Sequence, residues 1–124
     1  MIISKQATGP KLYAEELDDS QVCANGVLFH QALDYSATIS WDPPMGNIAT
    51  VTLTGNPTIS MERVCPGRFD LIVIQDATGS RTITWSSDFE GTAPTLSTAA
   101  DSKDIVHLVA DGTKMYFAGI TNVS

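Results

Sequence analysis

The chain has few charged residues and very few basic ones. Lysine, arginine, aspartate and glutamate together make up 17% of its 124 residues, below the roughly 25% of an average soluble domain. Seven residues are basic, and the formal net charge is −7 at pH 7. Because contacts with phosphate require a basic patch, this composition argues against nucleic acid as a partner and against binding to an anionic membrane surface.

Long apolar runs are also missing. No stretch approaches the roughly 20 residues of a membrane span, and Met1-Ile2-Ile3-Ser4-Lys5 lacks the apolar stretch of a signal peptide. We therefore expect no membrane partner and synthesis in a host bacterial cytoplasm. The length indicates one domain, large enough to bury a substantial core.

Cysteine is scarce, with Cys23 and Cys65 the only two. Neither has a second cysteine or a histidine at zinc-binding spacing, so no metal site is expected. Cytosolic proteins rarely keep disulfides, and we predict two buried, reduced thiols. A disulfide that pins the N-terminal segment to the domain is the alternative, and the sequence does not decide between them.

Catalytic motifs are absent as well. The only histidines are His30 and His107, and no nucleophile elbow, zinc-protease or phosphate-loop motif is present. His107 lies among Val and Leu in an apolar stretch, which indicates a core or interface residue, and Asp104 is a candidate partner for Arg81 or Lys103. The two tryptophans, Trp41 and Trp85, are interpreted as core or rim residues. The chain is therefore predicted not to be an enzyme and to need no cofactor.

The sequence is rich in alternating β-forming stretches. An apolar block over 69–74 runs into a polar loop in which Asp76 and Gly79 favour a turn, and the chain returns over 81–85 with alternating faces, which predicts a β-hairpin. Asp111-Gly112 predicts a second hairpin between 103–110 and 114–120. Turn signals recur about every 10 residues. We predict an all-β fold, an antiparallel, jelly-roll-like β-sandwich over residues 34–124, preceded by an extended N-terminal arm over residues 1–33.

Two strands are apolar on both faces, 69–75 and 105–109, so something must cover the second face. A homo-oligomer in which the arm and these strands form interfaces would cover it. The candidate interface residues are Leu12, Tyr13, Leu17, Ile72, Ile74, Val106 and Leu108. Loop tips are where a receptor-binding activity would lie. The candidate binding-loop residues are Asp76, Thr78, Ser80, Asp88 and Glu90.

A series of short motifs in fixed order resembles a β-domain of tailed-phage virion proteins. The motifs are Trp41-Asp42, Gly46-Asn47, the stretch 51–59, Pro66-Gly67, Gln75-Asp76, the stretch 79–85, the stretch 93–97, Asp104-Ile105 and the stretch 111–113. The resemblance covers roughly residues 34–119. That domain occurs in tail fibres, head fibres and capsid decoration proteins, and residues 1–33 have no counterpart in it.

The resemblance implies a compact β-sandwich, usually trimeric, that is displayed on a virion. Because this chain is short and lacks a fibrous repeat, we expect a trimeric capsid decoration or cement protein that bridges subunits of the major capsid protein. The alternative is a receptor- or glycan-binding tip domain of a head or tail fibre.

Overall fold

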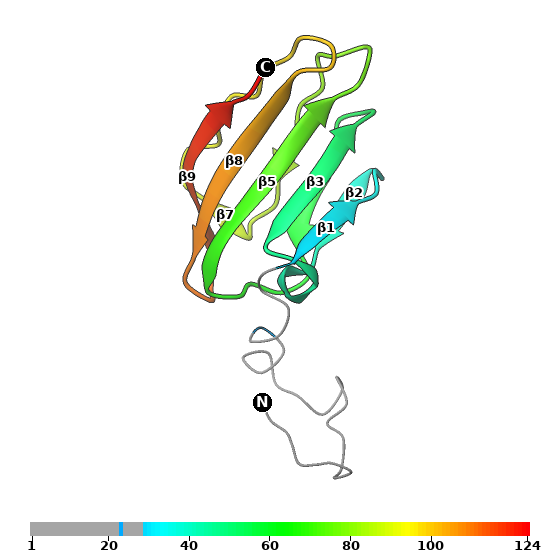
Figure 1. Cartoon of the computed structure of the whole chain (residues 1–124). Coiled ribbons are helices and arrows are strands. Elements are labelled where there is room, and N and C mark those ends of the chain that lie inside the picture. Colours follow the sequence, from blue (N-terminus) through cyan, green and yellow to red (C-terminus); the bar gives the residue numbers. More distant parts are fainter. Residues whose placement is uncertain (1–22, 24–28) are drawn as a thin grey trace.

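The computed structural model of the protein describes Cys23 and residues 29–124, and its secondary structure is almost entirely β. Nine strands form a six-stranded sheet in the order β1-β3-β5-β8-β9-β7 and a three-stranded sheet in the order β2-β4-β6 (Figure 1). The elements are β1 (His30–Leu33), β2 (Thr38–Trp41), the 3-10 helix η2 (Pro43–Met45), β3 (Ile48–Leu53), β4 (Thr58–Met61), β5 (Gly67–Gln75), β6 (Thr84–Trp85), β7 (Phe89–Glu90), β8 (Lys103–Ala110) and β9 (Met115–Asn122).

The first six strands wind as a β-solenoid-like coil. β1, β3 and β5 pair in parallel in the large sheet, and β2, β4 and β6 pair in parallel in the small sheet. Each coil thus contributes one strand to each sheet. Residues stack from coil to coil, as in the ladder Ile39, Ile59 and Trp85. The apolar side of each ladder faces inward, because side chains alternate along a strand.

An antiparallel hairpin completes the large sheet. β8 pairs with β5 on one side and with β9 on the other, and a register shift follows His107. Asp111 Oδ1 accepts hydrogen bonds from the amides of Thr113 and Lys114, and Gly112 has a φ of +92°. The hairpin predicted at Asp111-Gly112 is therefore confirmed.

The hairpin predicted over 69–85 is wrong. β5 does not pair with the segment that follows it, since the chain crosses to the other sheet, where β6 pairs with β4. The amide of Thr82 binds Asn56 Oδ1 at 2.8 Å and that of Thr84 binds Pro57 O at 2.9 Å. These contacts with the preceding coil outcompete local pairing. The all-β class is confirmed, whereas the antiparallel jelly-roll arrangement is replaced by mixed sheets with a parallel, solenoid-like part.

The core lies between the two sheets and is fully apolar at its centre. Trp41 is 0% exposed, packs edge-on against Phe69 with ring centroids 6.0 Å apart, and donates its indole N–H to Gly46 O at 3.2 Å. The predicted core role of Trp41 is confirmed. Trp85 is half-buried and packs edge-on against Phe89 and Phe117 at the far side of the core.

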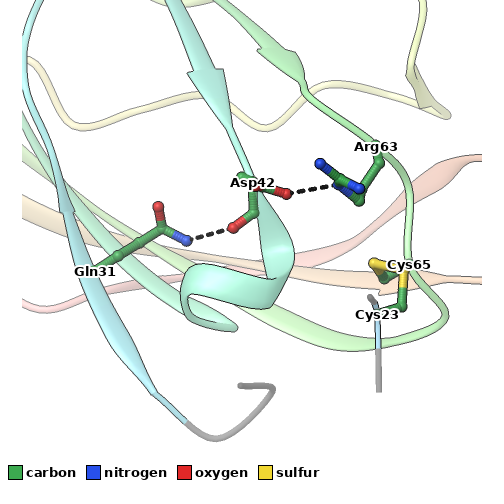
Figure 2. Close-up of a disulfide and its surroundings, with 5 residues drawn as sticks. All are labelled: Cys23, Gln31, Asp42, Arg63 and Cys65. Atoms are coloured by element: carbon green, nitrogen blue, oxygen red, sulfur yellow. Dashed lines mark hydrogen bonds and ion pairs between the residues drawn. A yellow bond between two sulfur atoms is a disulfide. The ribbon is translucent and has the colours of Figure 1, made fainter. Parts of the chain in front are cut away.

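Cys23 and Cys65 form a disulfide, with Cα atoms 5.5 Å apart (Figure 2). The prediction of two reduced thiols is therefore wrong. The coil brings together residues that are 42 positions apart, which spacing alone does not reveal. Nearby, Arg63 Nε donates to Asp42 Oδ1 at 2.9 Å and Gln31 Nε2 donates to Asp42 O at 2.8 Å.

β1 lies on the N-terminal side of the boundary predicted after residue 33, and it pairs with β3. The division into arm and domain stays a prediction, because most of the arm lies outside the described residues. Within the part that is described, no helix has the length and apolar character needed to cross a membrane.

Candidate functional site

The outer face of the six-stranded sheet carries a small apolar centre. Ile72 on β5 lies opposite Ile105 on β8, and both side chains are half-buried on this face. Ile74 lies on the same face of β5. Three of the predicted interface positions behave differently or are not seen. Val106 and Leu108 are 0% and 1% exposed in the core, so the outward positions of β8 are Ile105, His107 and Val109.

The arm residues proposed for the interface, Leu12, Tyr13 and Leu17, lie outside the described residues. Their role therefore stays a prediction. The structure does fix one point of the preceding chain, because Cys23 is held against the domain by its disulfide.

A hydrogen-bonded row crosses the outer face next to the isoleucine pair. His107 Nδ1 lies 2.7 Å from Asp70 Oδ1, and its Nε2 lies 2.8 Å from Thr121 Oγ1. The three residues come from β5, β8 and β9, and the side chains of His107 and Asp70 are 41% and 42% exposed. The row fixes the imidazole on an open, flat face. His107 is therefore a surface residue of this chain, available to an interface and absent from the core.

The loop after β5 is rigidly built around Asp76. Its Oδ1 accepts the amides of Thr78 and Gly79 at 3.1 and 3.0 Å, and its Oδ2 accepts Arg81 Nη2 at 2.9 Å. The Arg81 guanidinium, followed by the Gly79 amide, lowers the pKa of Asp76 below its usual value, and Asp76 in turn raises the pKa of Arg81. The predicted turn role of Asp76 is confirmed, and Arg81 pairs with Asp76 instead of Asp104.

Gly79 marks the place where two loops touch. Its φ is +74°, and a Cβ there would lie 2.6 Å from Thr98 O. The amide of Ser80, itself at a φ of +61°, donates to the same oxygen at 2.7 Å. The predicted loop residues Thr78 and Ser80 are exposed on this supported turn.

Gln75 and Asp104 hold the two loops together, and sequence reasoning missed the role of both. Gln75 is 2% exposed, and its side chain donates to Arg81 O and Ser97 O and accepts from the amide of Arg81. Asp104, also 2% exposed, accepts the amide of Ser97 at 2.7 Å and Asn122 Nδ2 at 3.1 Å. A polar side chain at the inward phase of an apolar strand is the signal that indicates such a role.

The other predicted loop residues lie at the opposite end of the sheet. Asp101 N donates to Asp76 O beside the start of β8, whereas Met115 N donates to Asp88 O beyond its end. Asp88 Oδ2 also accepts the amide of Met61 at 2.9 Å, so this carboxylate joins β4 to the loop before β7. Glu90 is exposed on β7. The structure therefore brings together Asp76, Thr78 and Ser80 and separates them from Asp88 and Glu90.

The loop at Asp111 is ordered in a similar way. Asp111 Oδ2 accepts the hydroxyl of Tyr116 at 2.9 Å. The backbone N–H groups of Lys114 and Thr113, then the hydroxyl of Tyr116, lower the pKa of Asp111, and the carboxylate raises the pKa of Tyr116. Across Cys23 and residues 29–124, no three His, Cys, Asp or Glu side chains come together as metal ligands.

Comparison with known proteins identifies one family. A family model described as "Putative phage tail fibre C-terminal domain" matches residues 35–115. This range begins just before β2 and ends at the first residue of β9, so it takes in strands of both sheets and more than half of the chain. No curated protein and no solved structure matches the chain.

Proposed function

Since the chain belongs to the phage tail fibre C-terminal domain family, we propose that it is a structural component of a phage virion that ends a fibre and faces the host. The family match over residues 35–115 is the observation that carries this proposal. The protein acts by binding and carries out no reaction, so it needs no cofactor. Its partners are other copies of itself and virion proteins, with no role for nucleic acid or membrane, and its formal charge of −7 is consistent with this.

The receptor-contacting surface in this proposal is the supported loop at Thr78 and Ser80. Asp76 and Arg81 fix the turn from below, and Gln75 ties it to the loop at Ser97. A rigid loop loses little conformational entropy when it binds, so its affinity for a surface glycan or protein is higher than that of a mobile loop.

Competition for adsorption tests this proposal. The purified chain is expected to reduce adsorption of the phage that encodes it, and the double variant Thr78→Lys, Ser80→Lys is expected to lose this effect. Thr113→Lys serves as the matched control, because Thr113 is exposed at the opposite end of the sheet. Equal inhibition by both variants would remove this loop from receptor binding, and no inhibition by the unmodified chain would contradict a receptor-facing role.

The second candidate is a capsid decoration or cement protein, a homotrimer that bridges subunits of the major capsid protein. The apolar pair Ile72 and Ile105 on the outer sheet face favours it, because such a surface gains about 25 cal/mol per Å² when a neighbour covers it. Copy number separates the two functions: hundreds of copies per particle support shell decoration, and a handful support a fibre. Heating particles with and without the protein tests cementing, which requires earlier DNA release from the particles that lack it.

A further inference from the structure

The first coil of the solenoid leaves two strand edges open on the same side of the molecule. β1 ends the six-stranded sheet and β2 ends the three-stranded sheet (Figure 1). β4 donates to the carbonyls of Ala37 and Trp41, and bonds to one neighbour alternate along a parallel strand. The backbone groups of Thr38 and Ser40 therefore point away from β4. The hydroxyl of Ser36 occupies Thr38 O, while no described residue bonds the amide of either residue.

The edge of β1 is open in the same way. β3 donates to Phe29 O from Ile48, so the backbone groups of His30 and Ala32 face outward. An unpaired edge is a template for another strand, and here both sheets offer one side by side.

Exposed apolar side chains flank these edges. Phe29 is 61% exposed and Met45 is 64% exposed, and Tyr35 between β1 and β2 is 38% exposed. Large apolar side chains that gather beside unpaired backbone are the surface that one more coil would cover.

The coil spacing shows which residues would form that coil. From His30 to its partner Ile48 is 18 residues, and from Ile48 to Asp70 is 22. In the small sheet the steps from Thr38 to Thr58 and from Thr58 to Thr84 are 20 and 26 residues. The same steps taken backward reach residues 8–12 from His30 and residues 12–18 from Thr38. Three apolar residues fall in this window, namely Leu12, Tyr13 and Leu17.

The disulfide holds this part of the chain close to the open edges. Cys23 is bonded to Cys65, and Arg63, two residues before Cys65, pairs with Asp42 directly after β2 (Figure 2). The window ends five residues before Cys23. A short tether of this kind gives a local concentration of the order of millimolar, so weak strand pairing suffices for docking.

We propose that residues 8–18 of this chain dock on β1 and β2 as one further parallel coil, covering Phe29, Tyr35 and Met45. The inference goes beyond the proposed function, because it concerns how the chain completes its own fold and holds for a fibre tip or a decoration protein alike. The hydrogen bonds would come from the outward amides of the first coil, and the apolar residues of the window would continue the inward ladders.

Hydrogen exchange on the full, oxidised chain tests this proposal, with Ser40→Pro and Ser40→Ala as the matched pair. Proline removes only an outward amide and leaves the bonds between β2 and β4, whereas alanine keeps that amide. In the unmodified chain, amides of residues 8–18 are expected to exchange at least tenfold more slowly than in an unstructured peptide. Ser40→Pro is expected to abolish this protection and Ser40→Ala to retain it, while the amides of β5 and β8 stay protected in all three.

A second variant covers the case in which Ser40→Pro fails to fold. Tyr13→Asp with Leu17→Asp changes no described residue, and it is expected to speed exchange at the amides of Thr38 and Ser40 by a similar factor. Unprotected residues 8–18 in the unmodified chain, or protection that Ser40→Pro leaves intact, would overturn the proposal. Protection that disappears on dilution would assign the edge to a second copy and would overturn docking within the chain.

Discussion

At the scale of single residues, a few buried polar groups decide where the loops go. Gln75 sits at the inward phase of β5 and replaces the apolar side chain that the strand pattern predicts there. Its carboxamide makes three hydrogen bonds to Arg81 and Ser97, so the loop after β5 and the loop before β8 are held as one unit. The proposed binding residues Thr78 and Ser80 depend on this support.

Replacing Gln75 with leucine is expected to lower the free energy of unfolding by about 2–4 kcal/mol, because buried partners lose their bonds at about 1–3 kcal/mol each. Urea denaturation followed by tryptophan fluorescence measures the change. Thr52→Ala is the control, since Thr52 is exposed on β3 and its change is expected to stay within about 0.5 kcal/mol. A Gln75→Leu variant as stable as the control would show that the bonds contribute nothing net.

The Asp76 carboxylate predicts a pH dependence. Its pKa is lower in the folded chain than its usual value of 3.8, chiefly through Arg81. A carboxyl with a lowered pKa contributes stability above the unfolded-state pKa and loses it as the pH falls. Asp76→Asn is therefore expected to be less stable than the unmodified chain at about pH 6, with a difference that shrinks below about pH 4. Asp34→Asn is the control, and thermal unfolding across pH 3–7 is the measurement; a deficit independent of pH would contradict the assignment.

At the scale of elements, contacts between coils override local hairpin formation. The segment 81–85 alternates as a strand should, yet its amides bind the turn at Asn56 and Pro57 of the preceding coil. The turn after β5 bends toward the loop at Thr98 instead of reversing beside β5. The position of Gly79 against that loop is what allows the crossing between sheets.

Gly79→Ala is expected to lower the free energy of unfolding by about 2 kcal/mol or more, because it adds a clash with backbone to a left-handed conformation. The added Cβ would lie 2.6 Å from Thr98 O and 2.8 Å from Ala100 N. Gly119→Ala is the matched control, because Gly119 also has a positive φ of +142° but no atom within 4 Å of a Cβ. Chemical denaturation of both compares them, and equal losses would show that the contact between the loops is unimportant.

At the scale of the whole molecule, the disulfide joins the N-terminal part of the chain to the core. Cys23 and Cys65 are 8% and 0% exposed, so a reductant reaches the bond only when the structure opens. The bond closes a loop of 42 residues that includes the first two coils. It therefore constrains the unfolded chain over the part of the fold that has an open edge.

Removal of this bond by Cys23→Ser is expected to lower the free energy of unfolding by about 4 kcal/mol, from the loop-closure entropy of this separation. Denaturant unfolding of the oxidised chain and the variant gives the difference. Non-reducing peptide mass spectrometry of the purified protein checks that the bond is present. The exposed-residue variant Ser87→Ala provides the control, and a Cys23→Ser chain as stable as the oxidised one would show that the bond does not stabilise the fold.

The sequence by itself determined the all-β class, most strand positions, the hairpin at Asp111-Gly112 and the turn at Asp76, because these rest on alternation and on local bonds between residues a few positions apart. Only the tertiary structure decided that the early strands pair in parallel, that Cys23 meets Cys65, and that Asp76 and Asp88 lie at opposite ends of the sheet. It also showed that Val106 and Leu108 belong to the core while Ile72 and Ile105 face outward. Two strands apolar on both faces look alike in sequence, and which face is buried depends on where the next coil lies. Pairing between coils joins residues about 20 positions apart, and no local preference encodes it.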